Sequence, residues 1–392
     1  MIKYSVKGGD KVESLKINYI MYSTGRTGGS RGLMNLMNEL VKLGHEISIT
    51  VLHYDSWFPL SPDIRIITKK TKLDLYYFYG VQKISKRNTI LRHIFFINKL
   101  MSIVPRVDVN AATFSPTAYI ASWKSMDGST PFYHMQHFET IFFGDPVMKK
   151  FVYDSYFLPI YKIANSIWLR EKLFEITGTR YPIVNTAVEH DIFYKRDTNG
   201  IKKNEDGNRI DIVALGKGGW KKATSIYKAV SKVRALEKDR EIVLHYFGHN
   251  PPKDIPVDGK RTVFLKDPSD DELATLYSNS DIQITFSDAE SFPLPPLEAM
   301  ACGCSVITTP FGTEDYAVDG ETALVVEPGN TDMLAEKIRI LIEDDALRNK
   351  LKERGIKTAS RFNYPSQGKI LEGEIKKAMG ENATRDWKSK LI

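Results

Sequence analysis

Apolar and polar residues follow one another along the chain in patterns that predict alternating strands and helices. Ile282, Ile284 and Phe286 alternate with polar residues, as in a strand. Between residues 30 and 44 the apolar residues recur three and four positions apart, as on one face of a helix. Further strands are predicted at 16–22, 47–52, 108–114, 131–136, 210–215, 241–247, 262–265 and 306–308. Further helices are predicted at 270–277, 332–342, 346–361 and 366–379. This alternation predicts an α/β protein.

The stretch 280–310 predicts a strand, a proline-rich loop, a short helix and a second strand. Pro293 and Pro295 lack the N–H that a sheet or a helix interior needs, so the segment between them is predicted to be a loop. Pro296 suits the first position of a helix, and Gly303 is suited to end it.

Two carboxylates, Glu290 and Glu298, bracket this loop with seven residues between them. A strand-to-helix turn brings such residues to the carboxyl end of a parallel sheet, where open α/β folds bind ligands. The helix N-terminus beside Glu298 also offers unpaired N–H groups to an anion. The competing interpretation is that both glutamates are simply solvated at the surface.

Length and composition indicate two globular domains. The chain has 392 residues, of which 42% are hydrophobic and 26% charged. The net charge of +7 is compatible with phosphate-bearing ligands, an anionic membrane surface or nucleic acid. Because neither zinc-finger spacing nor an RNP-like strand occurs, we do not expect nucleic acid as a partner.

The two cysteines, Cys302 and Cys304, are too few and too close together for a disulfide framework, which indicates a reducing compartment. The start of the chain is polar and lacks the apolar core of a secretory signal. The longest apolar run, 94–104, is too short to span a bilayer. We therefore expect a cytoplasmic protein.

Residues 64–106 interleave basic and aromatic residues. Such a surface can lie on the anionic face of a membrane. A solvated face over an ordinary core is the competing interpretation.

Two further loops have the composition of phosphate-binding segments. The segment 23–29 contains glycines between a strand and a helix, so its backbone can approach a phosphate or sugar closely. It lacks the dinucleotide and P-loop fingerprints. The segment 216–223 carries Lys217 and Lys222 before a predicted helix, and a solvated basic turn is the competing interpretation.

The residues from Glu290 to Gly303 closely resemble the E-x7-E segment of retaining glycosyltransferases of family GT4, which have the GT-B fold. The resemblance extends from Lys266 into the helix after Asn330. Pro293 stands where the family usually has glycine, and the proline-rich version is similar to a rhamnosyltransferase-like branch.

The resemblance implies a role for each residue that matches the family. Glu298 would hold the ribose hydroxyls, and Glu290 the hydroxyls of the donor sugar. His137, preferred to His134, would face the donor sugar, and Gln136 and Glu139 would shape the acceptor pocket. Lys217, where the family has arginine, and Lys222 would neutralise the leaving diphosphate. The remaining donor-site candidates are Gly28, Gly29, Arg31, Gly216, Phe292 and Leu294.

The GT-B resemblance also implies an architecture and partners. It implies two Rossmann-like domains facing a central cleft, at 1–195 on the acceptor side and 196–375 on the nucleotide-sugar side, with a C-terminal helix at 376–392 that packs back on the first domain. The linker is expected at 197–208 or slightly earlier. The donor would be a nucleotide-diphosphate sugar, the acceptor a glycan or lipid-linked molecule, and no cofactor or obligatory metal would be needed.

Three alternatives stay open at this point. A nucleotide-sugar 2-epimerase would share the scaffold and act on the donor without an acceptor. A non-catalytic glycosyltransferase-like partner protein would keep the fold, and Lys217 and Pro293 are the departures that favour it. A Rossmann oxidoreductase would need a dinucleotide fingerprint, which the sequence lacks.

Overall fold

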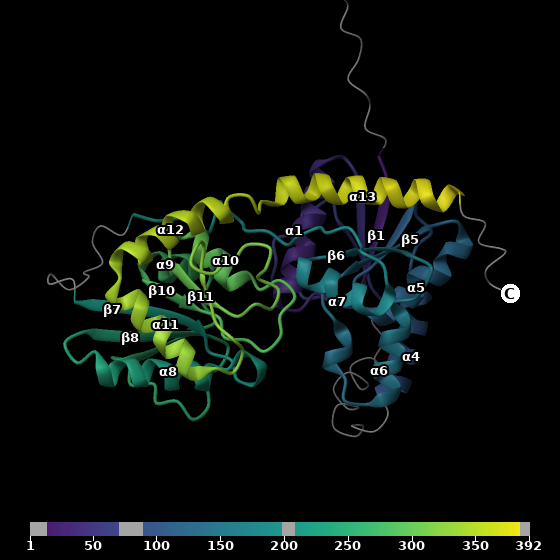
Figure 1. Cartoon of the computed structure of the whole chain (residues 1–392). Helices are drawn as coiled ribbons and strands as arrows, with labels where there is room; N and C mark the ends of the chain where they lie inside the picture. Colours follow the sequence, from purple (N-terminus) through teal and green to yellow (C-terminus); the bar gives the residue numbers. More distant parts are fainter. Residues whose placement is uncertain (1–13, 70–88, 198–207, 385–392) are drawn as a thin grey trace, which may run out of the picture. The chain divides into compact units, whose positions relative to one another are not determined.

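The computed structural model describes residues 14–69, 89–197 and 208–384 (Figure 1). The strands in these ranges form two six-stranded sheets whose paired strands run parallel, and helices connect them. This confirms the predicted α/β class with two Rossmann-like sheets.

The contacts divide the chain into two compact units. Unit 1 comprises residues 1–135, 139–163 and 368–392, and unit 2 comprises residues 136–138 and 164–367. The prediction puts the boundary at residue 195, whereas contacts group the segment from Ala164 onward with unit 2. The amide of Ala164 donates to the carbonyl of Pro182, and the amide of Val184 donates to the carbonyl of Ala164. Residues 198–207 of the predicted linker lie outside the described residues.

Unit 1 contains the sheet of order β3-β2-β1-β4-β5-β6. Its strands are β1 (Lys16–Ser23), β2 (Glu46–His53), β3 (Arg65–Ile67), β4 (Val109–Ala112), β5 (Thr130–Met135) and β6 (Tyr161–Ala164). Its helices are α1 (Gly28–Lys42), α4 (Thr89–Met101), α5 (Ser115–Lys124), α6 (Pro146–Ser155) and most of α13 (Tyr364–Thr384), with the 3₁₀ turns η2 (Ser125–Asp127) and η3 (Glu139–Phe142). Ala164, the last residue of β6, is grouped with unit 2.

Helix α1 begins earlier than predicted. The hydroxyl of Thr27 accepts a hydrogen bond from the amide of Ser30 at 3.1 Å, so Thr27 is the N-cap. Gly28 and Gly29 are therefore the first two helical residues and do not belong to a loop. Their amides lie in the first turn, where helix N–H groups have no intrahelical acceptor.

The strand predicted at 108–114 is shorter in the structure, because Phe114 becomes the N-cap of α5. Part of the basic and aromatic segment 64–106 is described as β3 and α4. Its central residues 70–88 lie outside the described residues.

The last helix, α13, is a single helix from Tyr364 and packs on unit 1 from Gly368 onward (Figure 1). A Cβ atom on Gly368 would lie 2.6 Å from Cβ of Glu39 on α1, so only glycine allows this approach. The Tyr161 hydroxyl donates to Glu374 at 2.7 Å. The helix is uninterrupted at residue 376, where the predicted tail begins.

Unit 2 contains the sheet of order β12-β11-β10-β7-β8-β9. Its strands are β7 (Arg209–Leu215), β8 (Glu241–Gly248), β9 (Thr262–Lys266), β10 (Ile282–Ile284), β11 (Ser305–Thr308) and β12 (Leu324–Val325). Its helices are α7 (Ile167–Thr177), α8 (Ala223–Leu236), α9 (Asp270–Asn279), α10 (Leu294–Ala301), α11 (Thr331–Glu343) and α12 (Asp345–Ala359), with the 3₁₀ turn η4 (Gly219–Lys221). Helices α8 and α11 cover one face of this sheet, and α9, α10 and α12 lie over the other (Figure 1).

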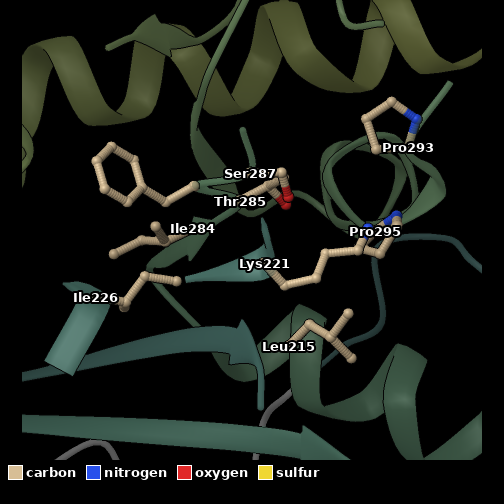
Figure 2. A pocket seen from close by; sticks show the side chains of 9 residues that line it. Leu215, Lys221, Ile226, Ile284, Thr285, Ser287, Pro293 and Pro295 are labelled. Atoms are coloured by element: carbon tan, nitrogen blue, oxygen red, sulfur yellow. The ribbon is translucent and has the colours of Figure 1, made fainter. Parts of the chain in front are cut away.

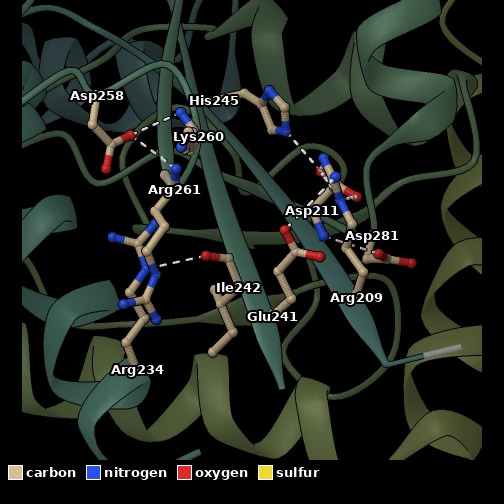
Figure 3. Close-up of polar contacts among 10 residues, drawn as sticks. All are labelled: Arg209, Asp211, Arg234, Glu241, Ile242, His245, Asp258, Lys260, Arg261 and Asp281. Carbon is tan, nitrogen blue, oxygen red and sulfur yellow. Dashed lines mark hydrogen bonds and ion pairs between the residues drawn. The ribbon is translucent and has the colours of Figure 1, made fainter. Parts of the chain in front are cut away.

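Charged side chains join the strands of unit 2 toward their amino ends (Figure 3). Asp211 on β7 accepts from Arg209 at 2.8 Å, and Nε2 of His245 on β8 lies 2.7 Å from the same carboxylate oxygen. Burial alone would raise the pKa of Asp211, but the hydrogen bonds from His245 and Arg209 hold it below its usual value. The Asp211 amide donates to Asp281, which precedes β10. These polar contacts hold the amino ends of the strands together. In open α/β folds ligands bind at the opposite edge, where the carboxyl ends of the strands lie.

Helix α10 starts at Leu294, two residues before the predicted start, with Pro293 as its N-cap. Pro295 and Pro296 are tolerated inside it because the first four N–H groups of a helix have no intrahelical acceptor. The preceding strand ends at Ile284, and Gly303 ends the helix in the left-handed conformation, with φ of 80°. Among the described residues no helix is both long and apolar enough to cross a membrane.

Candidate functional site

The loop after β7 begins at Gly216, beside the carboxyl end of the sheet. The Gly216 amide donates to the carbonyl of Phe247 at 2.8 Å. A Cβ atom on Gly216 would lie 3.2 Å from Cβ of Tyr246 and 3.3 Å from the ring of Phe264. Close packing against β8 and β9 therefore explains this glycine without a ligand.

Two adjacent lysines on this loop contact different carboxylates. The ammonium of Lys221 pairs with the carboxylate of Glu290. The ammonium of Lys222 lies 2.8 Å from Oδ2 of Asp288. Lys222 has φ of 55° and caps α8 in the left-handed conformation, so the backbone turns between the two lysines. Both pairs tie this loop to the segment that follows β10.

The Glu290 loop is also joined to the segment after β5. The hydroxyl of Ser291 donates to Oδ1 of Asn165 at 2.6 Å. The side-chain amide of Asn165 donates to the carbonyl of Gln136 at 2.9 Å. Asn165 is 4% exposed, so this bridge is shielded from water. It fixes the neighbouring His137 and Glu290 segments within unit 2.

His137 lies within electrostatic reach of both members of the Lys221–Glu290 pair. Burial lowers the pKa of its imidazole below the usual value; Glu290 opposes this change and Lys221 adds to it. The imidazole is therefore neutral at pH 7. Its ring packs edge-on against Trp168, with centroids 5.8 Å apart. His134 is buried inside β5, so the structure brings His137, and not His134, into the group with Glu290 and Lys221.

Glu139, expected in an acceptor pocket, is buried in unit 1. Its carboxylate accepts from the Ser115 amide at 2.7 Å and from the Tyr133 hydroxyl at 3.1 Å. Burial raises its pKa to about 7, and these hydrogen bonds oppose the rise. Glu139 is 2% exposed and anchors η3 to the start of α5.

The other residues expected at the donor site lie in both units, three of them buried in unit 2 and three at the start of α1 in unit 1. Glu298 is buried on α10. Phe292 and Leu294 are buried as well, and the Phe292 ring packs edge-on against Tyr316, 5.5 Å away. Their side chains fill the interior, while the amide of Leu294 lies at the start of α10, where N–H groups lack intrahelical acceptors. Gly28, Gly29 and Arg31 lie at the start of α1 in unit 1.

Two pockets lie at the carboxyl edge of the unit 2 sheet, one at the ends of β7 and β10 and the other at the ends of β7 and β8. The smaller is shown in Figure 2, where Lys221 extends toward Pro295 and the hydroxyls of Thr285 and Ser287 lie nearby. The larger has a volume of about 580 Å³, within the range of small-molecule sites. It lies between the loops after β7 and β8, and its lining includes Gly216, Lys217, Thr224, Asn250 and Lys253.

Sequence reasoning missed three residues of this group: Asn165, Lys221 and Asp288. The resemblance aligns Lys222 with the family lysine and gives no role to its neighbour Lys221. Asp288 lies two residues before Glu290 in a loop without periodicity. Asn165 lies 126 residues from its partner Ser291, and no local pattern links them. Within the described ranges, no group of three or more His, Cys, Asp or Glu residues could hold a metal ion.

The part of the chain that contains most of these residues is similar to a known family. Residues 202–358 match the model of the family Glycosyl transferases group 1. N-acetyl-alpha-D-glucosaminyl L-malate synthase of Bacillus anthracis is 26% identical over 180 residues, which cover 44% of this chain and 46% of that protein. D-inositol 3-phosphate glycosyltransferase of Corynebacterium diphtheriae is 31% identical over 113 residues, which cover 29% of this chain and 26% of that protein. The chain thus matches less than half the length of these curated relatives.

Solved structures share the fold over almost the whole chain. Anabaena HepE in complex with UDP and glucose has a TM-score of 0.68 at 14% identity, covering 93% of this chain and 100% of that one. Sucrose-phosphate synthase from Thermosynechococcus elongatus has a TM-score of 0.70 at 16% identity, covering 94% and 100%. The chain has the GT-B fold. The similarity to group 1 glycosyl transferases covers residues 202–358, which is less than half of the chain.

Proposed function

We propose that the protein is a retaining GT4-type glycosyltransferase that moves a sugar from a nucleotide-diphosphate sugar to a glycan, lipid-linked or other acceptor. The observation that carries the proposal is the group formed by Lys221, Glu290 and His137 at the carboxyl edge of the unit 2 sheet. A pocket of about 580 Å³, whose lining includes Lys217, lies along the same edge. Anabaena HepE, which has a similar fold, was solved in complex with UDP and glucose and in complex with UDP-glucose. We propose the same class of donor here, used in cell-surface polysaccharide or glycoconjugate synthesis.

The proposed reaction needs no protein nucleophile. The acceptor oxygen bonds to the anomeric carbon on the face that the diphosphate leaves. The bond from that carbon to the diphosphate oxygen breaks, and its electron pair stays on the oxygen. The acceptor proton passes to the same departing phosphate, so atoms and charge balance. The residues of this chain then act by positioning and by stabilising charge.

Each residue has a role that suits its surroundings. Lys217 and Lys222 neutralise the diphosphate as negative charge develops on it. Glu290 accepts hydrogen bonds from hydroxyls of the donor sugar, and Glu298 from the ribose hydroxyls. His137, neutral at pH 7, orients the sugar by hydrogen bonding and adds no charge. No metal is required in this scheme, because the lysines and the helix N-terminus supply positive charge.

The decisive experiment is a binding panel of UDP, GDP, TDP and their common sugars, including TDP-rhamnose, followed by calorimetry and thermal unfolding. A ligand at a hundredfold excess over its Kd stabilises the folded protein by about 2.7 kcal/mol, which is easily visible. The rhamnose donor tests the resemblance to rhamnosyltransferases.

For the Glu298→Ala variant we expect weaker binding of the nucleotide that stabilises the wild type, because a ribose hydroxyl loses its acceptor. The matched control is Glu336→Ala on α11 of the same unit, which should bind as the wild type does. Unchanged affinity in Glu298→Ala would remove the ribose role. If no nucleotide binds the wild type, the non-catalytic alternative replaces this proposal.

We also propose that the protein works at the cytoplasmic face of a membrane and docks there through unit 1. Unit 1 carries 27 Lys and Arg against 16 Asp and Glu, which favours an anionic lipid surface. The surface of η3, α6 and the turn after α6 exposes apolar side chains next to Lys149 and Lys150. These are Ile141, Phe142, Val147, Tyr153 and Phe157. Apolar side chains flanked by lysines suit the headgroup boundary of a bilayer.

A further inference from the structure

The two lysines of the loop after β7 differ in burial as well as in partner. The Lys221 side chain is 17% exposed and its partner Glu290 is 12% exposed. The Lys222 side chain is 34% exposed and its partner Asp288 is 42% exposed. The resemblance assigns the catalytic lysine to position 222, yet Lys221 forms the more buried pair.

A more buried ion pair is coupled more strongly than a surface pair. Water screens the Lys222–Asp288 pair, so it contributes little to holding either residue. The Lys221–Glu290 pair is partly desolvated, and removing one partner leaves the other charge poorly compensated. The position of the Glu290 carboxylate therefore depends on Lys221.

The pair leaves Glu290 with capacity to bind a ligand. A carboxylate offers about four acceptor sites, and the ammonium of Lys221 contacts Oε1. Oε2 keeps its acceptor sites for hydroxyl groups. Lys221 also lines the small pocket of Figure 2, under the residues that lead from β10 to Glu290.

We propose that Lys221 is a positioning residue that holds Glu290 ready for the donor sugar, and that it does not bind the diphosphate. This inference rests on the proposed function and adds to it that different lysines act on the two ends of the donor. Lys217 and Lys222 act on the diphosphate. Lys221 acts on the sugar end of the donor through Glu290. Recognition of the sugar and recognition of the nucleoside diphosphate are then separable by substitution.

The test is calorimetry with two probes, UDP and UDP-glucose, or the GDP or TDP pair if the panel selects that base. In Lys221→Met we expect affinity for the sugar nucleotide to fall about tenfold or more, because Glu290 loses its orientation. Affinity for the bare nucleoside diphosphate should stay within about twofold of the wild type. Lys221→Arg keeps the charge and should restore most of the lost affinity. Lys228→Met, an exposed lysine on α8, is the matched control and should change neither affinity.

A double-variant cycle separates action through Glu290 from any other effect. In a Glu290→Gln background, the further change Lys221→Met should have little effect on sugar-nucleotide affinity, since the residue that Lys221 positions is already altered. Thermal unfolding of each variant establishes that it is folded.

Three results would overturn the inference. Equal losses for both probes in Lys221→Met would make Lys221 a phosphate ligand. No loss for either probe would mean that the pair has no part in recognition. Failure of the wild type to bind either probe, or any nucleotide, would remove the proposed function itself and this inference with it.

Discussion

At the scale of the residue, the backbone of the loop after β7 decides which lysine meets which carboxylate. The 3₁₀ turn η4 ends at Lys221, and Lys222 adopts the left-handed conformation with φ of 55°. Adjacent side chains separated by such a turn need not share a partner. Lys221 pairs with Glu290, and Lys222 remains half-buried beside Asp288, from which a diphosphate can draw it.

For Lys222→Ala we expect kcat to fall about 10²- to 10³-fold, because one preorganised donor to the leaving diphosphate is lost. Initial rates with the donor that the panel identifies would measure the effect. Lys228→Ala on the same helix is exposed and should keep the wild-type rate. Turnover near the wild-type value in a folded Lys222→Ala protein would contradict the assigned role.

At the scale of the element, the Glu290 loop is held by contacts from segments on both sides of it. The Tyr316 hydroxyl donates to the carbonyl of Pro293 at 2.7 Å. Asn165 accepts from Ser291. Gly312 comes so near that a Cβ atom there would lie 2.2 Å from the carbonyl oxygen of Ser291. This packing therefore sets the shape of the Glu290 loop. Position 312 is glycine because the backbone there passes close to the backbone of Ser291.

For Gly312→Ala we expect the free energy of unfolding to fall by about 1–3 kcal/mol beyond the cost of left-handed backbone alone, because the methyl group displaces Ser291. Gly320→Ala is the matched control, since Gly320 has the same φ of 70° but no atom within 4 Å of the position that an added methyl group would take. Urea titration of both variants measures the difference. Equal losses would show that backbone conformation, not contact with Ser291, accounts for the effect.

At the scale of the whole molecule, charge is distributed unevenly between the two units. Unit 1 has 27 Lys and Arg against 16 Asp and Glu, whereas unit 2 has 28 against 32. The basic excess of the chain therefore lies in unit 1. A donor site in unit 2 and a basic unit 1 are consistent with an anionic surface as the partner of unit 1.

We expect the protein to co-sediment with vesicles of phosphatidylcholine and phosphatidylglycerol, and less with phosphatidylcholine alone. Binding should weaken as salt increases, because part of it is electrostatic. Tyr153→Ser combined with Phe157→Ser should reduce binding, since their side chains are 39% and 52% exposed on the proposed surface. Leu236→Ser in unit 2, where the leucine is 70% exposed, is the matched control. Equal binding to both vesicle types, or no effect of the double substitution, would contradict docking through unit 1.

Local sequence accounts for much of the fold and for the edge of the sheet that carries the site. Alternation along Ile282–Ile284 and the helical period of α1 each arise from neighbouring residues, so both elements are predictable. Boundaries are less predictable, because caps such as Thr27 and prolines tolerated in the first turn of α10 shift them by a few residues. Helices α5 and α6 are not predicted, and α6 exposes two apolar side chains, Val147 and Tyr153, which weakens the periodic signal.

The sequence by itself determined the α/β class, most of the strands and the two glutamates that flank the loop after β10. These features depend on residues close together in the chain. The short strands β3, β6 and β12 are not predicted. Tertiary structure alone decided that Glu290 meets Lys221, which is 69 residues away, and that Asn165 joins Ser291 to Gln136. It also grouped residues 136–138 with unit 2. Such contacts depend on how distant segments pack, and hydrophobic periodicity carries no information about which side chains then face one another.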